Sequence, residues 1–154
     1  MEAPILRHLF DGILLVGATV TIHSAGTLLL LWSMVKVRSR ALEHFGFLPN
    51  TLRLTVVVLA LLMLHLMEVA LWAAFYNFRG CFRDWPTSIY FSIVTYTTVG
   101  YGDVLLDKQW RLLGGVEALT GILMASWSTA LLLSVVNWIY THTRNRWGVQ
   151  AMDA

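Results

Sequence analysis

The chain has 154 residues, of which 57% are hydrophobic and 13% are charged, and its formal net charge at pH 7 is +2. This composition lies outside the range of soluble globular domains and is typical of membrane proteins. The small net charge gives no electrostatic basis for binding nucleic acid. A single cysteine, Cys81, excludes an intramolecular disulfide and a cysteine-based metal site.

Three apolar segments are long enough to cross a bilayer, which takes about 20 residues. They cover residues 13–35, 54–76 and 112–140. The first has a weak basic flank and no clear small-residue cleavage site after it, so we expect a spanning helix and not a signal peptide. The sequence therefore predicts an all-α membrane protein with three transmembrane helices.

A fourth apolar element, "PTSIYFSIVTYT" at residues 86–97, is too short to span the bilayer. Pro86 suits the first turn of a helix, and Asp84 is a good residue to cap it. A helix of this length extends about 18 Å, roughly halfway through a bilayer. We therefore expect a re-entrant helix, after which the chain returns to the side from which it entered.

The returning segment "TTVGYGD", residues 97–103, is rich in glycine and β-branched residues and does not favour a helix. Non-helical backbone at membrane depth is tolerated only where it is buried in protein or lines a water-filled cavity. Gly100 and Gly102 permit φ values closed to other residues, so successive carbonyl groups can point the same way. Such a row of oxygens, with the Thr98 hydroxyl at its inner end, can replace the hydration shell of a cation.

The run Thr98-Val99-Gly100-Tyr101-Gly102 matches the selectivity filter of potassium channels, in which four such loops surround the ions. The chain resembles the small bacterial potassium channels of the two-helix pore-domain family, with one extra N-terminal transmembrane helix. The resemblance includes the longer run "YFSIVTYTTVGYGD" and the order outer helix, pore helix, filter, inner helix. It implies a homotetramer that conducts K⁺ passively across the lipid bilayer. The ions would bind at Thr98, Val99, Gly100 and Tyr101, with no other cofactor.

The resemblance also divides the chain into parts. These are an extra helix and cytoplasmic loop at 1–53, a pore module at 54–140 and a short cytoplasmic tail at 141–154. Within the pore module, the pore helix covers residues 86–97, the filter covers 98–102 and the inner helix covers 111–140.

Two departures from the family pattern affect the interpretation. Some family members carry a pore-helix glutamate that holds the filter aspartate, and the matching position here is Val94. Asp103 must therefore find another partner, and Tyr90 is the best candidate, so Thr97, Asp103, Tyr90 and Val94 form the predicted filter support. The second departure is the extra helix, which has no arginine between residues 13 and 35. A voltage sensor needs several gating charges, so voltage gating through this helix is not expected.

The family's outward-facing filter implies an N-terminus outside and a C-terminus in the cytoplasm, in a bacterial inner membrane. This orientation places six basic residues inside (Lys36, Arg38, Arg40, Arg53, Arg144 and Arg146) and five outside (Arg7, Arg79, Arg83, Lys108 and Arg111). The difference is small support from the positive-inside rule. The predicted orientation therefore depends mainly on the resemblance.

The inner helix should line a cavity along one face. The family's hinge glycine corresponds to Gly121, and counting in fours gives Ala125, Thr129, Leu133 and Asn137. We expect Thr129 to face water and Leu133 to form a hydrophobic constriction that gates by dewetting. The alternative is that this stripe only packs on a neighbouring helix.

Four ionisable residues, His23, His65, Glu68 and Glu117, fall within the predicted spans. Such residues are costly in a membrane and are candidates for function. We expect His23 or His65 to hydrogen-bond Glu68, which would tie the extra helix to the pore module, and Glu117 to support the pore helix from behind the filter. The alternatives are polar contacts without a gating role, a proton sensor, or a metal site, for which the His-x-x-Glu spacing supplies only two ligands.

Cys81 lies in a short outer loop, where it either packs as a free thiol or pairs with Cys81 of a neighbouring chain.

Other functions find less support. No serine-histidine-aspartate, metal or phosphate-binding pattern indicates an enzyme, and "GYGD" is not a nucleotide-binding loop. The alternative to a channel is a non-conducting or regulatory membrane subunit of a channel assembly.

Overall fold

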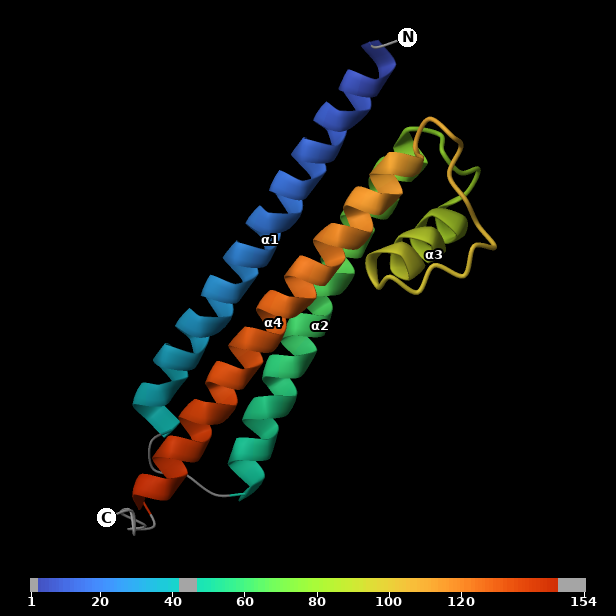
Figure 1. Cartoon of the computed structure of the whole chain (residues 1–154). Coiled ribbons are helices and arrows are strands. Elements are labelled where there is room, and N and C mark those ends of the chain that lie inside the picture. The colour runs from blue at the N-terminus through green and yellow to red at the C-terminus, as the bar shows by residue number, and fades with distance from the viewer. Residues whose placement is uncertain (1–2, 42–46, 147–154) are drawn as a thin grey trace, which may run out of the picture.

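The computed structural model describes residues 3–41 and 47–146, and in these residues it has four helices and no strand. They are α1 (Ala3–Ala41), α2 (Phe47–Phe78), α3 (Trp85–Tyr96) and α4 (Arg111–Arg146). The three long helices lie side by side as a bundle, and the short α3 lies beside the end where α2 finishes and α4 begins (Figure 1).

Three helices are long and apolar enough to cross a membrane: His8–Lys36 in α1, Leu48–Phe78 in α2 and Arg111–Arg144 in α4. The prediction of an all-α integral membrane protein with three spanning helices is therefore confirmed. Each helix extends beyond its predicted apolar segment, because a helix can continue for several turns into its polar flanks outside the hydrocarbon. α4 includes residues 141–146, which were predicted to begin the tail.

Some predicted features lie outside the described residues. They are residues 42–46 of the predicted cytoplasmic loop, residues 147–154 of the predicted tail, and the side chains of Arg7, Arg38, Arg40 and Arg146.

The order of the helices places the start of α1 and the end of α4 at opposite ends of the bundle. α1 runs from the end that carries α3 to the far end, α2 returns, and α4 runs to the far end again (Figure 1). The start of α1 therefore lies on the same side as the re-entrant helix, as a chain with three spans requires. Which of these ends faces outward stays a prediction.

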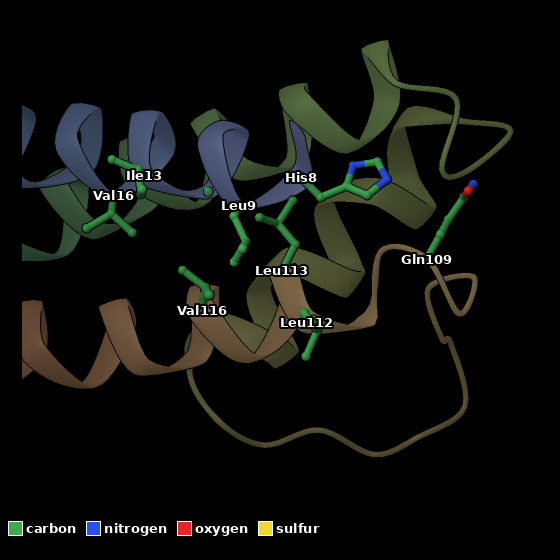
Figure 2. A pocket seen from close by; sticks show the side chains of 9 residues that line it. His8, Leu9, Ile13, Val16, Gln109, Leu112, Leu113 and Val116 are labelled. Atoms are coloured by element: carbon green, nitrogen blue, oxygen red, sulfur yellow. The ribbon is translucent and has the colours of Figure 1, made fainter. Parts of the chain in front are cut away.

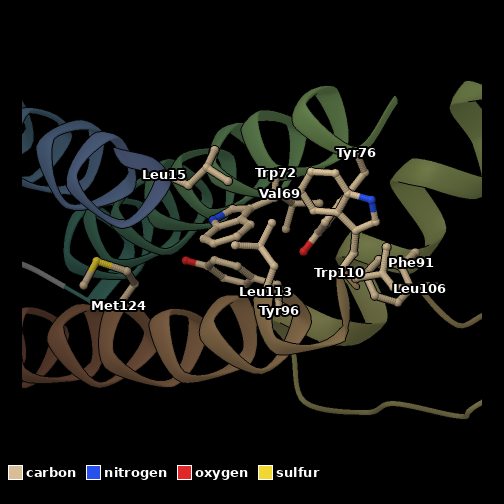
Figure 3. Close-up of a cluster of buried hydrophobic side chains, with 10 residues drawn as sticks. All are labelled: Leu15, Val69, Trp72, Tyr76, Phe91, Tyr96, Leu106, Trp110, Leu113 and Met124. Atoms are coloured by element: carbon tan, nitrogen blue, oxygen red, sulfur yellow. The ribbon is translucent and has the colours of Figure 1, made fainter. Parts of the chain in front are cut away.

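The main hydrophobic core lies where all four helices meet (Figure 3). Its buried members are Leu15, Val69, Trp72, Tyr76, Phe91, Tyr96, Leu106, Trp110, Leu113 and Met124. Trp72 and Tyr76 are fully buried. A smaller core of Val57, Leu61, Leu131 and Val135 joins α2 to α4 nearer the other end of the bundle. α3 is thus fixed to the bundle by large aromatic side chains, which make the largest contribution to apolar burial.

Two polar contacts join α1 to the α2 region in addition to apolar packing. The indole Nε1 of Trp72 donates a hydrogen bond of 3.0 Å to Thr19 Oγ1, inside the core. Arg79, just after α2, donates to both carboxylate oxygens of Asp11 at 2.6 Å. These contacts fix α1 against the bundle at two levels, so it is an integral part of the folded chain.

A pocket of about 230 Å³ lies between the beginning of α1 and the beginning of α4 (Figure 2). Its lining is mainly aliphatic and includes Leu9, Ile13, Val16, Leu112 and Val116. The pocket contains none of the predicted filter residues.

Candidate functional site

The pore helix α3 begins at a well-formed cap. Asp84 has an extended backbone, with φ of −144°, and its carboxylate accepts a hydrogen bond of 2.9 Å from the backbone N–H of Thr87. Pro86 occupies the first turn, where its missing N–H costs nothing. Both sequence signals are therefore confirmed, and the helix covers 85–96, one residue earlier than the predicted 86–97.

The segment after α3 has an unusual backbone. Thr98, Gly100 and Gly102 have φ angles of 61°, 50° and 78°, whereas the two residues between them do not have positive φ. The N–H of Gly100 donates to the carbonyl oxygen of Val94 at 3.0 Å, which folds the first part of the segment back against the end of α3. A β-branched residue at positive φ is rare, so the conformation of Thr98 marks a structural constraint at this site.

The predicted partner of Asp103 is present. The hydroxyl of Tyr90 donates to Asp103 Oδ2 at 2.7 Å, which joins the middle of α3 to the residue that follows the glycine-rich segment. Val94 is buried beneath the segment, and the Thr97 hydroxyl donates to the carbonyl oxygen of Ile93 at 2.6 Å. Asp103 thus has the partner that the sequence analysis expected for it.

Gly121 of α4 lies against the end of α3. A Cβ atom built on Gly121 would overlap the backbone carbonyl oxygen of Tyr96 and would lie 2.9 Å from its carbonyl carbon. Only glycine therefore allows α4 to pack this closely under the residue that ends the pore helix. This close approach is a packing role that the prediction of a hinge did not include.

The other residues of the predicted cavity stripe differ from Gly121. Ala125, Thr129, Leu133 and Asn137 all lie on the exposed surface of α4, and Leu133 is 60% exposed. Within one chain this stripe therefore contacts no other helix extensively. It is available either to a cavity or to another subunit.

A cluster of polar side chains lies between α1, α2, α3 and α4, at the level where α3 ends. Nδ1 of His23 lies 2.8 Å from Glu68 Oε1, and Nδ1 of His65 lies 3.3 Å from Glu68 Oε2. Tyr96 donates its hydroxyl hydrogen to the same carboxylate. The predicted contact of Glu68 with a histidine is therefore confirmed, and both candidate histidines make it.

Glu117 joins the three helices of the predicted pore module. It is fully buried on α4, and its Oε2 accepts a hydrogen bond of 2.9 Å from the hydroxyl of Tyr76 on α2. The hydroxyl of Ser92 on α3 faces the same carboxyl group, although neither Ser92 Oγ nor Glu117 Oε1 has a hydrogen bond of normal geometry. This position, behind α3, agrees with the expectation that Glu117 supports the pore helix.

Sequence reasoning missed three polar residues of this region. Ser128 lies 3.0 Å from His65 Nε2, Tyr96 completes the cluster around Glu68, and Asp11 pairs with Arg79. A basic partner for Asp11 could have been predicted, since an acidic residue next to an apolar span is costly unless it is paired. Tyr96 and Ser128 carried none, because aromatic and hydroxyl residues are ordinary in membrane helices.

Cys81 lies after α2 and is half-buried against the main core, without a disulfide in the described chain. Burial raises the pKa of its thiol to about 11. Its environment within one chain is that of a packed thiol, and the other alternative, pairing with Cys81 of a neighbouring chain, stays a prediction.

Comparison with known proteins identifies the region that holds these features. Residues 62–137 match the model of the family described as "Ion channel". The match covers much of α2, all of α3, the glycine-rich segment and most of α4, whereas α1 lies before it. The ion-channel match therefore includes the residues that were predicted to form a filter, its support and a cavity.

The curated relatives are potassium channels. The "Potassium voltage-gated channel protein Shal" of Drosophila melanogaster is 28% identical over 120 residues, which cover 77% of this chain and 19% of that protein. The "A-type voltage-gated potassium channel KCND3" of Homo sapiens is 27% identical over 123 residues, which cover 77% of this chain and 16% of that protein. The chain thus spans less than a fifth of the length of these relatives. No solved structure matches it.

Proposed function

We propose that the chain is one subunit of a potassium-selective channel, in which four copies place residues 98–102 around a common axis. The segment itself carries the proposal. It follows a short re-entrant helix, has positive φ at alternate residues, and leaves Val99 and Tyr101 50% and 73% exposed in one chain. Backbone of this kind needs polar partners at membrane depth. Neighbouring copies and dehydrated cations would supply the cover and the partners that one chain lacks.

In this proposal the ions bind to oxygen atoms alone. Carbonyl groups of Thr98, Val99, Gly100 and Tyr101, with the Thr98 hydroxyl, replace the water around K⁺. The C-terminal end of α3 lies directly before this segment, and a helix C-terminus carries a partial charge of about −0.5. Four such ends would favour a cation at the inner mouth of the filter. Passive conduction needs no catalysed reaction and no cofactor beyond the permeant ions.

The backbone of Thr98 supports this assignment. A non-glycine residue at positive φ costs about 1–3 kcal/mol and persists only where the surrounding structure imposes it. Among the described residues, Thr98 is the one non-glycine residue with positive φ. It is the first residue of segment 98–102, whose carbonyl groups would have to point toward the ions. The proposed function accounts for the strain, because turning these carbonyls toward an axis requires it.

The exposed stripe of α4 has a matching place in the tetramer. Ala125, Thr129, Leu133 and Asn137 would line the cavity below the filter, with Leu133 as the hydrophobic constriction. The relatives are named as voltage-gated channels. We do not extend that property to α1, because residues 13–35 contain no lysine or arginine to act as gating charges. The N-terminus would face outward and the C-terminus the cytoplasm of a bacterial cell.

The experiment is a comparison of K⁺ and Na⁺ flux through the purified protein in liposomes, with Ba²⁺ as a blocker. Gly100→Ala tests the filter, because it replaces a glycine at positive φ within the proposed ion path. Gly80→Ala is the matched control. Gly80 also has positive φ, 69°, with open space around its Cα, but it lies in the loop after α2.

K⁺-selective, Ba²⁺-sensitive flux that Gly100→Ala abolishes and Gly80→Ala preserves is the expected result. Flux that does not distinguish K⁺ from Na⁺ would contradict the filter assignment. Absence of flux over a range of pH and membrane tension would favour the alternative, a non-conducting or regulatory subunit of a channel assembly.

A further inference from the structure

The polar cluster around Glu68 has the form of a metal site. His23 of α1 and His65 and Glu68 of α2 each direct a ligand atom to one place, and these atoms all lie within 4.8 Å of one another. The side chains of His23 and Glu68 are fully buried, and that of His65 is 21% exposed. Three potential ligands on two helices thus meet inside the membrane-spanning bundle.

We propose that His23, His65 and Glu68 bind a divalent transition-metal ion of the Zn²⁺ type, which joins α1 to the pore region. The inference goes beyond ion conduction and does not depend on it, since a chain that passes no K⁺ would still contain the site.

The hydrogen atoms available to the cluster support a cation at its centre. Ser128 Oγ lies 3.0 Å from His65 Nε2 and 3.4 Å from His23 Nε2. A hydroxyl has one hydrogen and can donate to only one of these two nitrogens. If both contacts are hydrogen bonds, the other histidine carries its own hydrogen on Nε2 and donates it to the serine oxygen. If that histidine is neutral, its Nδ1 is a bare lone pair.

Both Nδ1 atoms face the carboxylate of Glu68, at 2.8 Å from Oε1 for His23 and 3.3 Å from Oε2 for His65. A neutral cluster therefore sets at least one nitrogen lone pair against carboxylate oxygens, which are also acceptors. Two acceptors at this distance repel each other unless a proton or a metal ion lies between them. A metal ion bound by both nitrogens and the carboxylate removes this repulsion.

The dimensions fit a tetrahedral ion. Ligand bonds of about 2.0–2.1 Å separate the ligand atoms of a tetrahedral site by roughly 3.3 Å. The two Nδ1 atoms lie 2.8 and 3.3 Å from the two different oxygens of the carboxylate, and one ligand atom from each residue lies within 4.8 Å of the others, so small side-chain rotations would bring them to that separation. Two imidazoles and a carboxylate are also a donor set that Zn²⁺ uses in proteins. Mg²⁺ and Ca²⁺ prefer oxygen ligands alone, so the site should discriminate against them.

The surroundings supply the other parts of such a site. Ser128 can hold the two imidazole rings by their Nε2 atoms, as hydrogen-bond partners of metal-bound histidines commonly do. The hydroxyl of Tyr96 lies 3.3 Å from His65 Nδ1 and donates to Glu68, so it borders the site and fixes the carboxylate. The exposed part of the His65 side chain offers a way in for the ion.

The test is metal binding by the full chain purified in detergent. Isothermal titration with Zn²⁺ should show one ion per chain, Mg²⁺ should not compete, and Co²⁺ should give the intense visible absorption of a tetrahedral complex. His23→Ala and His65→Ala should abolish this binding. Ser128→Ala should weaken it by about 10- to 100-fold, the usual effect of removing a partner of a metal-bound histidine.

Matched controls separate this site from other ligands. His142→Ala removes a histidine near the end of α4, and Ser126→Ala removes an exposed serine that donates to the carbonyl oxygen of Ile122. Both should bind Zn²⁺ as the unaltered chain does. Circular dichroism checks that each variant is folded. If the histidine variants do not fold, the Co²⁺ spectrum of the unaltered chain shows whether a tetrahedral metal site is present.

Three results would overturn the proposal. They are the absence of stoichiometric Zn²⁺ binding, binding that persists in folded His23→Ala and His65→Ala, and a Co²⁺ spectrum without tetrahedral bands.

Discussion

Replacement of Gly121 by alanine tests how closely α4 and the pore helix must pack. A Cβ atom at this position would overlap the carbonyl oxygen of Tyr96, and it would lie 3.1 Å from Cδ1 of the Tyr96 ring. The oxygen belongs to the backbone and cannot rotate away as a flexible side chain could. Gly121→Ala must therefore push α4 away from the end of α3, two residues before Thr98.

Two opposing effects set the size of the change. Alanine stabilises a helix interior by about 1 kcal/mol relative to glycine. Overpacking of a close contact costs about 1–3 kcal/mol, and a clash with backbone belongs in the upper part of that range. We therefore expect Gly121→Ala to lower the free energy of unfolding by about 1–2 kcal/mol, and to reduce K⁺ flux because the end of α3 moves.

The assay is reversible unfolding in mixed detergent micelles, combined with liposome flux. Gly115→Ala is the control, because Gly115 lies on the same helix but is exposed, with nothing within 4 Å of an added Cβ. That variant should gain up to about 1 kcal/mol from helix propensity alone. If Gly121→Ala proves as stable as Gly115→Ala, the packing argument is refuted, and the predicted hinge becomes the better explanation of this glycine.

Three further predictions concern the residues around α3. Tyr90→Phe removes the 2.7 Å hydrogen bond to Asp103, so K⁺ flux should decline faster during sustained conduction. An unchanged time course of the flux would show that this bond does not stabilise the proposed filter. Asp84→Ala removes the cap of α3 and should lower the free energy of unfolding by about 1 kcal/mol in the same micelle assay; no change would mean that the cap is dispensable. The pKa of Cys81 is raised to about 11, so the fraction of thiolate at pH 8 is about one in a thousand. Because only the thiolate reacts with iodoacetamide, the rate of alkylation should rise about tenfold per pH unit up to pH 11. A titration midpoint near 8.5 would contradict the packed environment of this thiol.

Hydropathy and capping signals were sufficient to predict the main architecture. The three spans follow from apolar length alone, and Asp84 and Pro86 located the start of α3. The pairs Tyr90–Asp103 and His23–Glu68 were also predicted, because a buried or filter-adjacent charge needs a partner and few candidates lie at the right depth. Depth along a membrane helix can be counted from the sequence at 1.5 Å per residue.

The rotation of each helix about its own axis could not be predicted. Helices that are apolar all round carry no stripe to show which face turns inward. The approach of Gly121 to Tyr96 and the place of Ser128 beside two histidines depend on that rotation. The pairing of Asp11 with Arg79, 68 positions apart, depends on it as well. These contacts depend on how side chains of neighbouring helices fill space and pair their hydrogen-bonding groups. Neither can be read from a single sequence.

The contacts of α1 supply partners to polar side chains of the predicted pore module, residues 54–140. Trimming the chain to residues 54–140 would remove His23 from Glu68, Thr19 from the Trp72 indole and Asp11 from Arg79. A buried polar group that loses its partner costs about 1–3 kcal/mol. A shorter chain engineered from this protein would therefore need an apolar replacement at Trp72, whereas Glu68 would keep His65 and Tyr96 as partners. Three polar contacts thus cross the predicted boundary at residue 54, and a truncated chain would lose all of them.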